Sequence, residues 1–89
     1  MKHYDIKIHG DVHGVGYRFS AQAKARELDL VGFVRNEPDK TVYIEAEGEE
    51  ENLKKFMEWC NEGPLYAKIK KIESSEGKVQ NFNAFEIKD

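Results

Sequence analysis

The fold is decided by residues 4–28, which read YDIKIHGDVHGVGYRFSAQAKAREL. Apolar and polar residues alternate over residues 4–9, which is the two-residue period of a strand with one buried face. Three glycines among residues 10–16 interrupt this pattern. Apolar residues then recur at spacings of four, four and three, at Tyr17, Ala21, Ala25 and Leu28. The stretch therefore predicts a strand that ends near Gly10, a glycine-rich turn, and a helix that begins near Tyr17.

A hairpin is predicted after this helix. Residues 30–36 are extended in character, and residues 37–40, Glu-Pro-Asp-Lys, supply a turn. Residues 42–47 alternate again, with Val42, Ile44 and Ala46 on one face and Tyr43, Glu45 and Glu47 on the other. The apolar face is expected in the core. The other face is expected to be solvated or to cover the edge of a helix.

A second helix, an irregular extended segment and a last strand complete the pattern. Three glutamates at residues 49–51 favour the positive end of a helix, and Gly63-Pro64 ends it. Its buried stripe is predicted to contain Leu53, Phe56, Met57 and Cys60. In residues 67–74, Ile69 and Ile72 lie three apart, which indicates a bulge or a strand end. Phe85 and Ile87 form the last strand.

The order strand, helix, strand, strand, helix, strand is typical of one arrangement. This is the ferredoxin-like (split βαβ) sandwich, an α+β fold in which an antiparallel sheet carries two helices on one face. The 89 residues are expected to form a single domain, 1–89, because a domain usually needs roughly 100–200 residues. Unrelated functions share this fold, so the function must be argued from a site.

Composition limits the classes of function. The net charge is −3, so the chain lacks the basic excess that would attract a nucleic-acid backbone. The single cysteine, Cys60, cannot form an intrachain disulfide, and the opening residues contain no stretch that resembles a signal peptide. No window approaches the roughly 18 consecutive apolar residues of a membrane span. We therefore expect a monomeric, cytoplasmic protein that binds neither nucleic acid nor membranes.

The loop at residues 10–18, GDVHGVGYR, is a candidate anion site. A glycine-rich turn between a strand and a helix directs backbone N–H groups and the positive end of the helix at one point. Arg18 adds a permanent charge and a planar fork of donors suited to two phosphate oxygens. The same residues also fit an ordinary turn followed by a solvated arginine. Asn36 likewise has two interpretations, because asparagine favours turns and its amide can also fix a water opposite a bound phosphate.

Residues 10–18 resemble the acylphosphatase signature, in which the pattern G-x-V-Q-G-V-x-[FY]-R leads into the first helix. Residues 32–36, GFVRN, are similar to the second block of that family. The resemblance continues through Pro38-Asp39, Val42, Gly48, Gly63-Pro64 with Ala67, and Phe85-Glu86-Ile87. It covers almost the whole chain.

The resemblance implies an enzyme that hydrolyses acyl phosphates to a carboxylate and inorganic phosphate, with phosphate as product or inhibitor. Arg18 and Asn36 match the two catalytic side chains of the family. The residues that match its phosphate-binding loop are His13, Gly14, Val15, Gly16, Tyr17 and Arg18.

Three residues depart from the usual pattern of the family. His13 stands where the family usually has glutamine, which changes a side chain near the anion. Lys40 replaces the customary glycine of the hairpin turn, and Asp29 replaces a common glycine at the end of the first helix, where a left-handed residue is expected. These departures bear on turn geometry and stability more than on function.

This chemistry needs few groups. A carboxylate, whose conjugate acid has a pKa of about 4, leaves as a stable anion, so no general acid is required. Phosphoryl transfer depends mainly on positioning and charge stabilisation, which one arginine, backbone amides and a held water supply. The sequence contains no Walker-type loop and no paired His or Cys at metal-ligand spacing. We therefore expect neither a metal nor a cofactor.

The main alternative is a non-catalytic ferredoxin-like module that binds RNA or carries a metal. An RNA-binding sheet would show an aromatic-rich signature strand, and a copper carrier would show C-x-x-C in its first loop. Neither motif is present. A relative that only binds phosphorylated metabolites is a third possibility, against which the presence of both Arg18 and Asn36 argues.

Other residues have ordinary structural interpretations. His3 and His9 are expected at exposed positions, where a metal site built from them would lack a third ligand. Trp59 is expected to be partly buried beside the stripe of the second helix. The basic residues Lys68, Lys70 and Lys71 are expected on a solvated edge strand.

Overall fold

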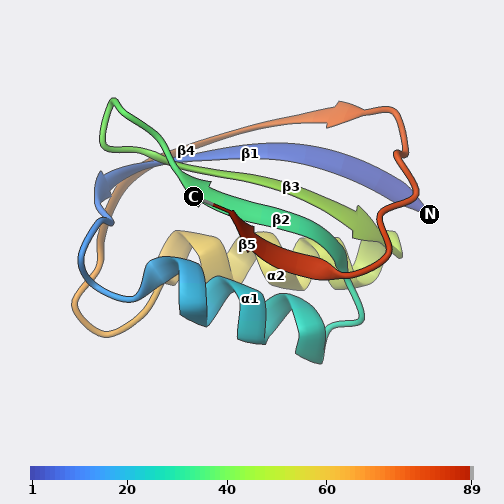
Figure 1. Ribbon diagram of the computed structural model, residues 1–89, viewed down its shortest axis with the longest axis horizontal. Helices are drawn as coiled ribbons and strands as arrows, with labels where there is room; N and C mark the ends of the chain where they lie inside the picture. Colours follow the sequence, from blue (N-terminus) through green and yellow to red (C-terminus); the bar gives the residue numbers. More distant parts are fainter. Residues whose placement is uncertain (89) are drawn as a thin grey trace.

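A five-stranded sheet carries two helices on one face (Figure 1). The computed structural model describes residues 1–88. In chain order its elements are β1 (Lys2–Asp11), α1 (Tyr17–Glu27), β2 (Val31–Asn36), β3 (Val42–Gly48), α2 (Glu50–Glu62), β4 (Lys68–Gly77) and β5 (Phe85–Lys88). The strand order across the sheet is β4-β1-β3-β2-β5. The predicted ferredoxin-like fold is confirmed, including the placement of both helices on the same face.

One pairing differs from the expected antiparallel sheet. The pairs β1–β3, β1–β4 and β2–β3 are antiparallel, but β2 and β5 are parallel. The reason lies in the route of the chain, because residues 78–84 carry it from β4 at one edge of the sheet to the opposite edge (Figure 1). There it enters β5 in the direction of β2, so the sheet is mixed.

The core lies between the sheet and the helices. The strands contribute Ile6, Ile8, Val34, Val42, Ile44 and Phe85, and the helices contribute Ala21, Ala25, Leu53, Phe56 and Cys60. The predicted stripe of α2 is thus buried, although Met57 is only partly so. Burial raises the pKa of the Cys60 thiol to about 12, so this cysteine stays protonated and is a core residue.

Of the two alternatives predicted for residues 67–74, a bulge or a strand end, the structure shows a bulge, and β4 is the predicted edge strand. His9 pairs with Lys71, whereas the next residue, Gly10, pairs with Ile69, so Lys70 is an extra residue in the ladder. Gly10 has φ 140°, and a side chain there would collide with the carbonyl of Lys68. The bulge lies where β1 leads into the glycine-rich loop, and bulges bend a strand at such points. The three lysines of this strand are exposed, as expected.

Two of the three departures from the family pattern adopt left-handed backbone angles. Asp29 has φ 57° after α1, which confirms the expected left-handed position, and Lys40 has φ 75° in the hairpin. A lysine in this region is strained by roughly 1–2 kcal/mol, since its Cβ crowds the backbone. The hairpin is held by Asp39, whose carboxylate accepts hydrogen bonds from the N–H (3.1 Å) and hydroxyl (2.5 Å) of Thr41.

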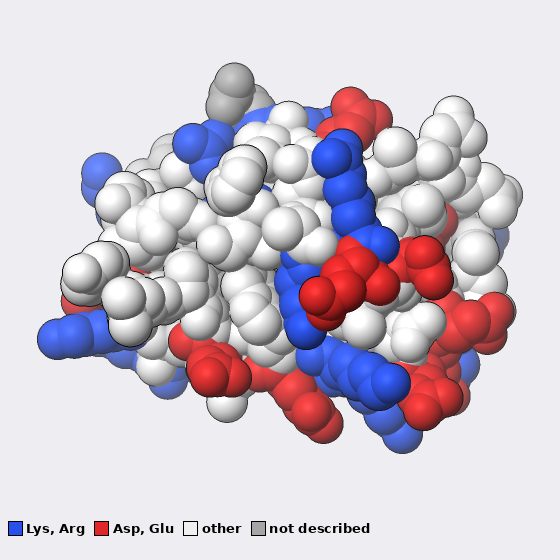
Figure 2. All heavy atoms as spheres, turned by 90° about the horizontal axis from the view of Figure 1, so that it is seen from below, with Lys and Arg blue, Asp and Glu red and all other residues white. Residues whose placement is uncertain are grey.

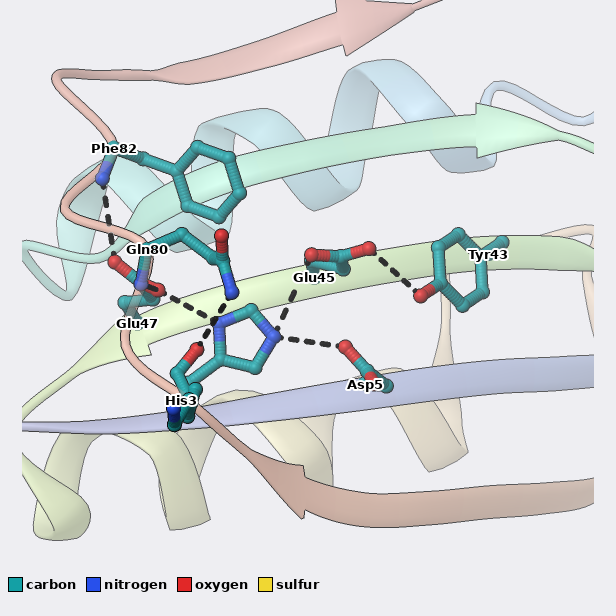
Figure 3. A network of polar contacts seen from close by, with 8 residues as sticks. His3, Asp5, Tyr43, Glu45, Glu47, Gln80 and Phe82 are labelled. Carbon is teal, nitrogen blue, oxygen red and sulfur yellow. Dashed lines mark hydrogen bonds and ion pairs between the residues drawn. The ribbon is translucent and has the colours of Figure 1, made fainter.

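On the sheet face opposite the helices, the expected exposure of two residues, His3 and Glu47, is wrong. His3 and Glu47 are only 2% and 0% exposed, although both were expected on a solvated face or at an exposed terminus. The covering residues come from the crossover segment, as Figure 3 shows. The N–H groups of Gln80 and Phe82 donate to the Glu47 carboxylate, and the Phe82 ring stacks on His3 at 6.2 Å. The alternation of residues along a strand cannot predict that an irregular segment elsewhere in the chain will cover one face of the sheet.

The pair of His3 and Glu47 makes stability depend on pH. Burial by itself would lower the pKa of His3, but hydrogen bonds to Glu47 (2.7 Å) and Asp5 (2.8 Å) outweigh it and raise this pKa above 6.5. Burial would raise the pKa of Glu47, but the N–H of Gln80 and the imidazole of His3 lower it below 4.5. The His3 contribution is therefore complete below pH 6.5 and is lost as the pH rises through the raised pKa. The Glu47 contribution is present above pH 4.5 and is lost as the pH falls through the lowered pKa.

We expect the free energy of unfolding to fall as the pH rises from 6.5 through the raised pKa of His3, and His3→Gln to remove most of that decline. Urea unfolding at several pH values measures the slope. His9→Gln is the matched control, because His9 is more exposed and contacts only Glu73 among the described ion pairs. A His3→Gln slope equal to that of the unchanged chain would contradict this account.

Candidate active site

The topology brings the glycine-rich loop and Asn36 to the same end of the molecule. Strands β1 and β2 both pair antiparallel with β3, so they run in the same direction and end at the same side of the sheet. The loop after β1 turns there into α1, and the end of β5 lies beside the end of β2 (Figure 1). Two segments distant in sequence therefore meet because of the strand order.

A hollow of about 190 Å³ lies at this end of the sheet. It is lined by Val12, Gly14, Gly16, Tyr17, Arg18, Phe19, Asn36 and Ile87. Five of the predicted site residues thus meet at one place: Gly14, Gly16, Tyr17, Arg18 and Asn36. His13 and Val15 belong to the same loop but do not line the hollow, since Val15 packs against the core. The site prediction missed Val12, Phe19 and Ile87.

The backbone of the loop is shaped by its glycines. Gly14 and Gly16 have φ 72° and 75°, a left-handed region that glycine enters without strain, and a side chain at either would meet open space. Gly16 is the N-cap of α1 and accepts the N–H of Ser20 at 3.0 Å. The N–H groups of the three preceding helical residues lie before the first intrahelical bond and point out of the helix end.

The N-terminus of α1 is suited to a negative charge. This helix has no side-chain cap and no acidic residue in its first turn, whereas α2 carries Glu50 and Glu51 there. The positive end of α1 is therefore not neutralised by an acidic side chain of its own first turn. Arg18, half-buried in that turn, adds its guanidinium to the same hollow. Together these groups can bind an oxyanion.

Asn36 lines the hollow and carries a buried acceptor. Its Oδ1 is inaccessible to solvent and receives no hydrogen bond from the described part of the chain. A buried acceptor without a donor destabilises a protein by about 1–3 kcal/mol.

The side chains of His13 and Tyr17 hold the loop in place. The Nε2–H of His13 donates to the carbonyl oxygen of Thr41 at 2.8 Å, and the same oxygen accepts the N–H of Glu37 at 2.9 Å. The Tyr17 hydroxyl donates to the Cys60 carbonyl at 2.8 Å, which ties the start of α1 to the end of α2. Burial raises the pKa of Tyr17 above its ordinary value, so the phenol stays neutral.

The described residues that line the hollow contain no metal-ligand set. Of the described residues that line it, none is His, Cys, Asp or Glu. A separate group, His3, Asp5 and Glu45, has its ligand atoms within 4.8 Å of one another on the opposite face of the sheet (Figure 3). There the shortest of these contacts, His3 Nε2 to Asp5 Oδ1, is an ordinary hydrogen bond of 2.8 Å. This group contributes nothing to the hollow.

The surface offers no broad basic area on the face that bears the helices. Figure 2 shows acidic and basic side chains interspersed there. Neither helix of residues 1–88 is long and apolar enough to span a membrane.

Comparisons with known proteins find relatives over nearly the whole chain. The family model for acylphosphatase matches residues 4–87. An acylphosphatase of Acaryochloris marina is 49% identical over 80 residues, which cover 90% of this chain and 86% of the relative. An acylphosphatase of Archaeoglobus fulgidus is 40% identical over 83 residues, 93% of each chain. The crystal structure of acylphosphatase from Bacillus subtilis matches with a TM-score of 0.98 at 34% identity and covers 100% of both chains. By fold, and by sequence over nearly its full length, the chain belongs to the acylphosphatase family.

Proposed function

We propose that this chain hydrolyses acyl phosphates with Arg18 and the backbone of residues 13–18 holding the phosphate and Asn36 positioning the attacking water. Membership of the family supports the reaction itself. The observation that supports the residue roles is that Asn36, whose buried Oδ1 receives no hydrogen bond from the described residues, lines the same hollow as Arg18 and the first residues of α1.

The phosphate end of the substrate fits the cationic side of the hollow. Arg18 donates through its planar fork to two phosphate oxygens, and the N–H groups at the start of α1 donate to another. These donors stabilise the charge that spreads over the phosphoryl oxygens in a loose transition state. Because Arg18 and the first residues of α1 border the hollow in the folded chain, little reorganisation would be needed when the reaction begins.

The water lies on the other side of the phosphorus. The side-chain amide of Asn36 forms a hydrogen bond with the water, which directs an oxygen lone pair toward the phosphorus. The water oxygen bonds to phosphorus as the bond from phosphorus to the acyl oxygen breaks, and both protons of the water remain on the phosphate product, which forms as H2PO4⁻. The carboxylate leaves without protonation, since its conjugate acid has a pKa of about 4. The described residues that line the hollow offer no carboxylic acid or imidazole, and this chemistry needs none.

The proposed mechanism is independent of metal ions. We expect hydrolysis of acetyl or benzoyl phosphate to proceed at the same rate in EDTA, because no described residue at the hollow is a metal ligand of the usual kind. An alkyl phosphate monoester serves as the companion substrate and should be turned over far more slowly, since its alkoxide needs a proton. Loss of activity in EDTA that a divalent ion restores would overturn the metal-free mechanism. Absence of hydrolysis with either acyl phosphate would overturn the proposed function.

We expect the His13 side chain to hold the loop in position and not to act on the phosphate through a positive charge. Its bond to Thr41 links the loop to the hairpin next to Asn36. His13→Gln retains a donor for this bond, so we expect it to keep turnover and the pH dependence of phosphate inhibition. His13→Ala removes the link, and turnover on benzoyl phosphate should fall by roughly tenfold. A change in the pH dependence of inhibition with His13→Gln would show that the imidazole charge acts on the phosphate.

The proposal also covers the oligomeric state of the enzyme, its location and the size of its substrates. We propose that the chain acts as a monomer in the cytoplasm on small acyl phosphates, and that inorganic phosphate inhibits it as a product. The mixed surface charge and the absence of a basic surface on the helix face support a small-molecule substrate in preference to nucleic acid.

A further inference from the structure

Large apolar side chains are exposed beside the hollow. Phe19 is 72% exposed and Ile87 is 37% exposed, and both line the hollow together with Arg18 and Asn36. Exposed apolar side chains that gather at a cavity mark a binding surface more often than isolated ones do. The folded chain therefore leaves at this site an apolar surface that the phosphate and the water do not use.

These side chains come from two elements on either side of the site. Phe19 follows Arg18 in the first turn of α1. Ile87 lies on β5 opposite Val34, two residues before Asn36, and so points to the same sheet face as Asn36. Val12, only 1% exposed, adds a third apolar residue to the lining. An apolar wall thus borders the cationic end of the hollow.

The two ends of an acyl phosphate match the cationic end and the apolar wall of the hollow. One end is a dianionic phosphate, and the other is an organic group attached to the carbonyl carbon. Apart from Arg18, the described lining contains no charged side chain that could pair with a charge on the organic group. An apolar ring, in contrast, can pack on Phe19 and Ile87 and remove their surface from water.

We propose that Phe19 and Ile87 form a subsite for the acyl group that selects acyl phosphates with a bulky apolar or aromatic group over acetyl phosphate and over substrates with a charged acyl group. This inference rests on the proposed function of the hollow. It concerns specificity, so Phe19 and Ile87 contribute to substrate binding and not to the phosphoryl chemistry.

The test compares two substrates across matched variants. The values of kcat and KM for benzoyl phosphate and for acetyl phosphate are measured with the unchanged chain, Phe19→Ala, Phe19→Leu and Ile87→Ala. Leu65→Ala is the control, because Leu65 is 87% exposed but does not line the hollow. The inhibition constant of phosphate reports whether the anion site is intact.

We expect the alanine variants to raise KM for benzoyl phosphate by about fivefold to tenfold, with kcat/KM for acetyl phosphate and phosphate inhibition within twofold of the unchanged chain. The KM of Phe19→Leu for benzoyl phosphate should lie between those of the unchanged chain and Phe19→Ala. Leu65→Ala should change the kinetic constants for neither substrate. An equal loss on both substrates would assign Phe19 and Ile87 to the fold or the anion site and overturn the subsite. No loss on benzoyl phosphate would also overturn it. Failure of the proposed function is distinguishable, because the unchanged chain would then hydrolyse neither substrate.

Discussion

Arg18→Ala is expected to lower kcat/KM for benzoyl phosphate by roughly 10²–10⁴-fold and to abolish inhibition by inorganic phosphate. Each hydrogen bond between charged groups contributes about 1.5–3 kcal/mol, and the proposed fork makes two of them. Their loss of about 3–6 kcal/mol converts to this range at 1.36 kcal/mol per factor of ten. Both substrate affinity and turnover should fall, because the phosphate is bound in the ground state and in the transition state.

Two further variants test the cause of this loss. Arg18→Lys keeps the charge but not the planar fork, so it should recover only a small part of the activity. Arg26→Ala removes the same charge from the other end of α1, where the guanidinium contacts the Phe85 carbonyl at 3.2 Å, and should retain most of the activity. Circular dichroism confirms that each variant is folded. Full activity of Arg18→Lys would mean that charge alone suffices and that the bidentate contact is wrong.

Asn36→Ala is expected to lower turnover by roughly a hundredfold or more while phosphate inhibition stays near that of the unchanged chain. The change removes no charge and leaves the loop and Arg18 in place, so the anion site should survive. It also removes a buried acceptor that no described donor satisfies, so the free energy of unfolding should stay the same or rise. A loss of activity without a loss of stability is the signature of a functional residue.

The control for this prediction is Asn61→Ala, which truncates an exposed asparagine on α2. It should leave turnover unchanged. Steady-state kinetics on benzoyl phosphate and urea unfolding measure the two quantities for both variants. Unchanged turnover in Asn36→Ala would make Asn36 an ordinary residue at the end of a strand, and the water-positioning role would be wrong.

The elements could be predicted because local patterns encode them. The alternation of residues 4–9, the glycines of residues 10–16 and the stripe of α2 each follow from contacts within one element and its buried face. The bulge in β4 was also predictable, since a break in alternation is visible in the sequence itself. The meeting of Arg18 with Asn36 in one hollow follows from the strand order, which the ferredoxin-like topology supplies.

The features that could not be predicted depend on contacts between distant segments. The parallel pairing of β5 results from the path of residues 78–84, which carry no regular pattern. The burial of His3 and Glu47 has the same origin, because Phe82 and the N–H of Gln80 reach them from that segment. The sequence alone indicates that Ile87 is a core residue of the last strand. Its position at the hollow depends on the register of β5 against β2, in which Ile87 pairs with Val34.

The division of roles between Arg18 and Asn36 is tested most directly by phosphate binding without turnover. Titration of each protein with inorganic phosphate, followed by ³¹P NMR, gives a dissociation constant for the anion site alone. Asn36→Ala should bind phosphate as tightly as the unchanged chain, within about twofold, whereas Arg18→Ala should show no saturable binding. Phosphate binding that persists in Arg18→Ala, or that disappears in Asn36→Ala, would contradict the assignment of the anion to Arg18 and of the water to Asn36.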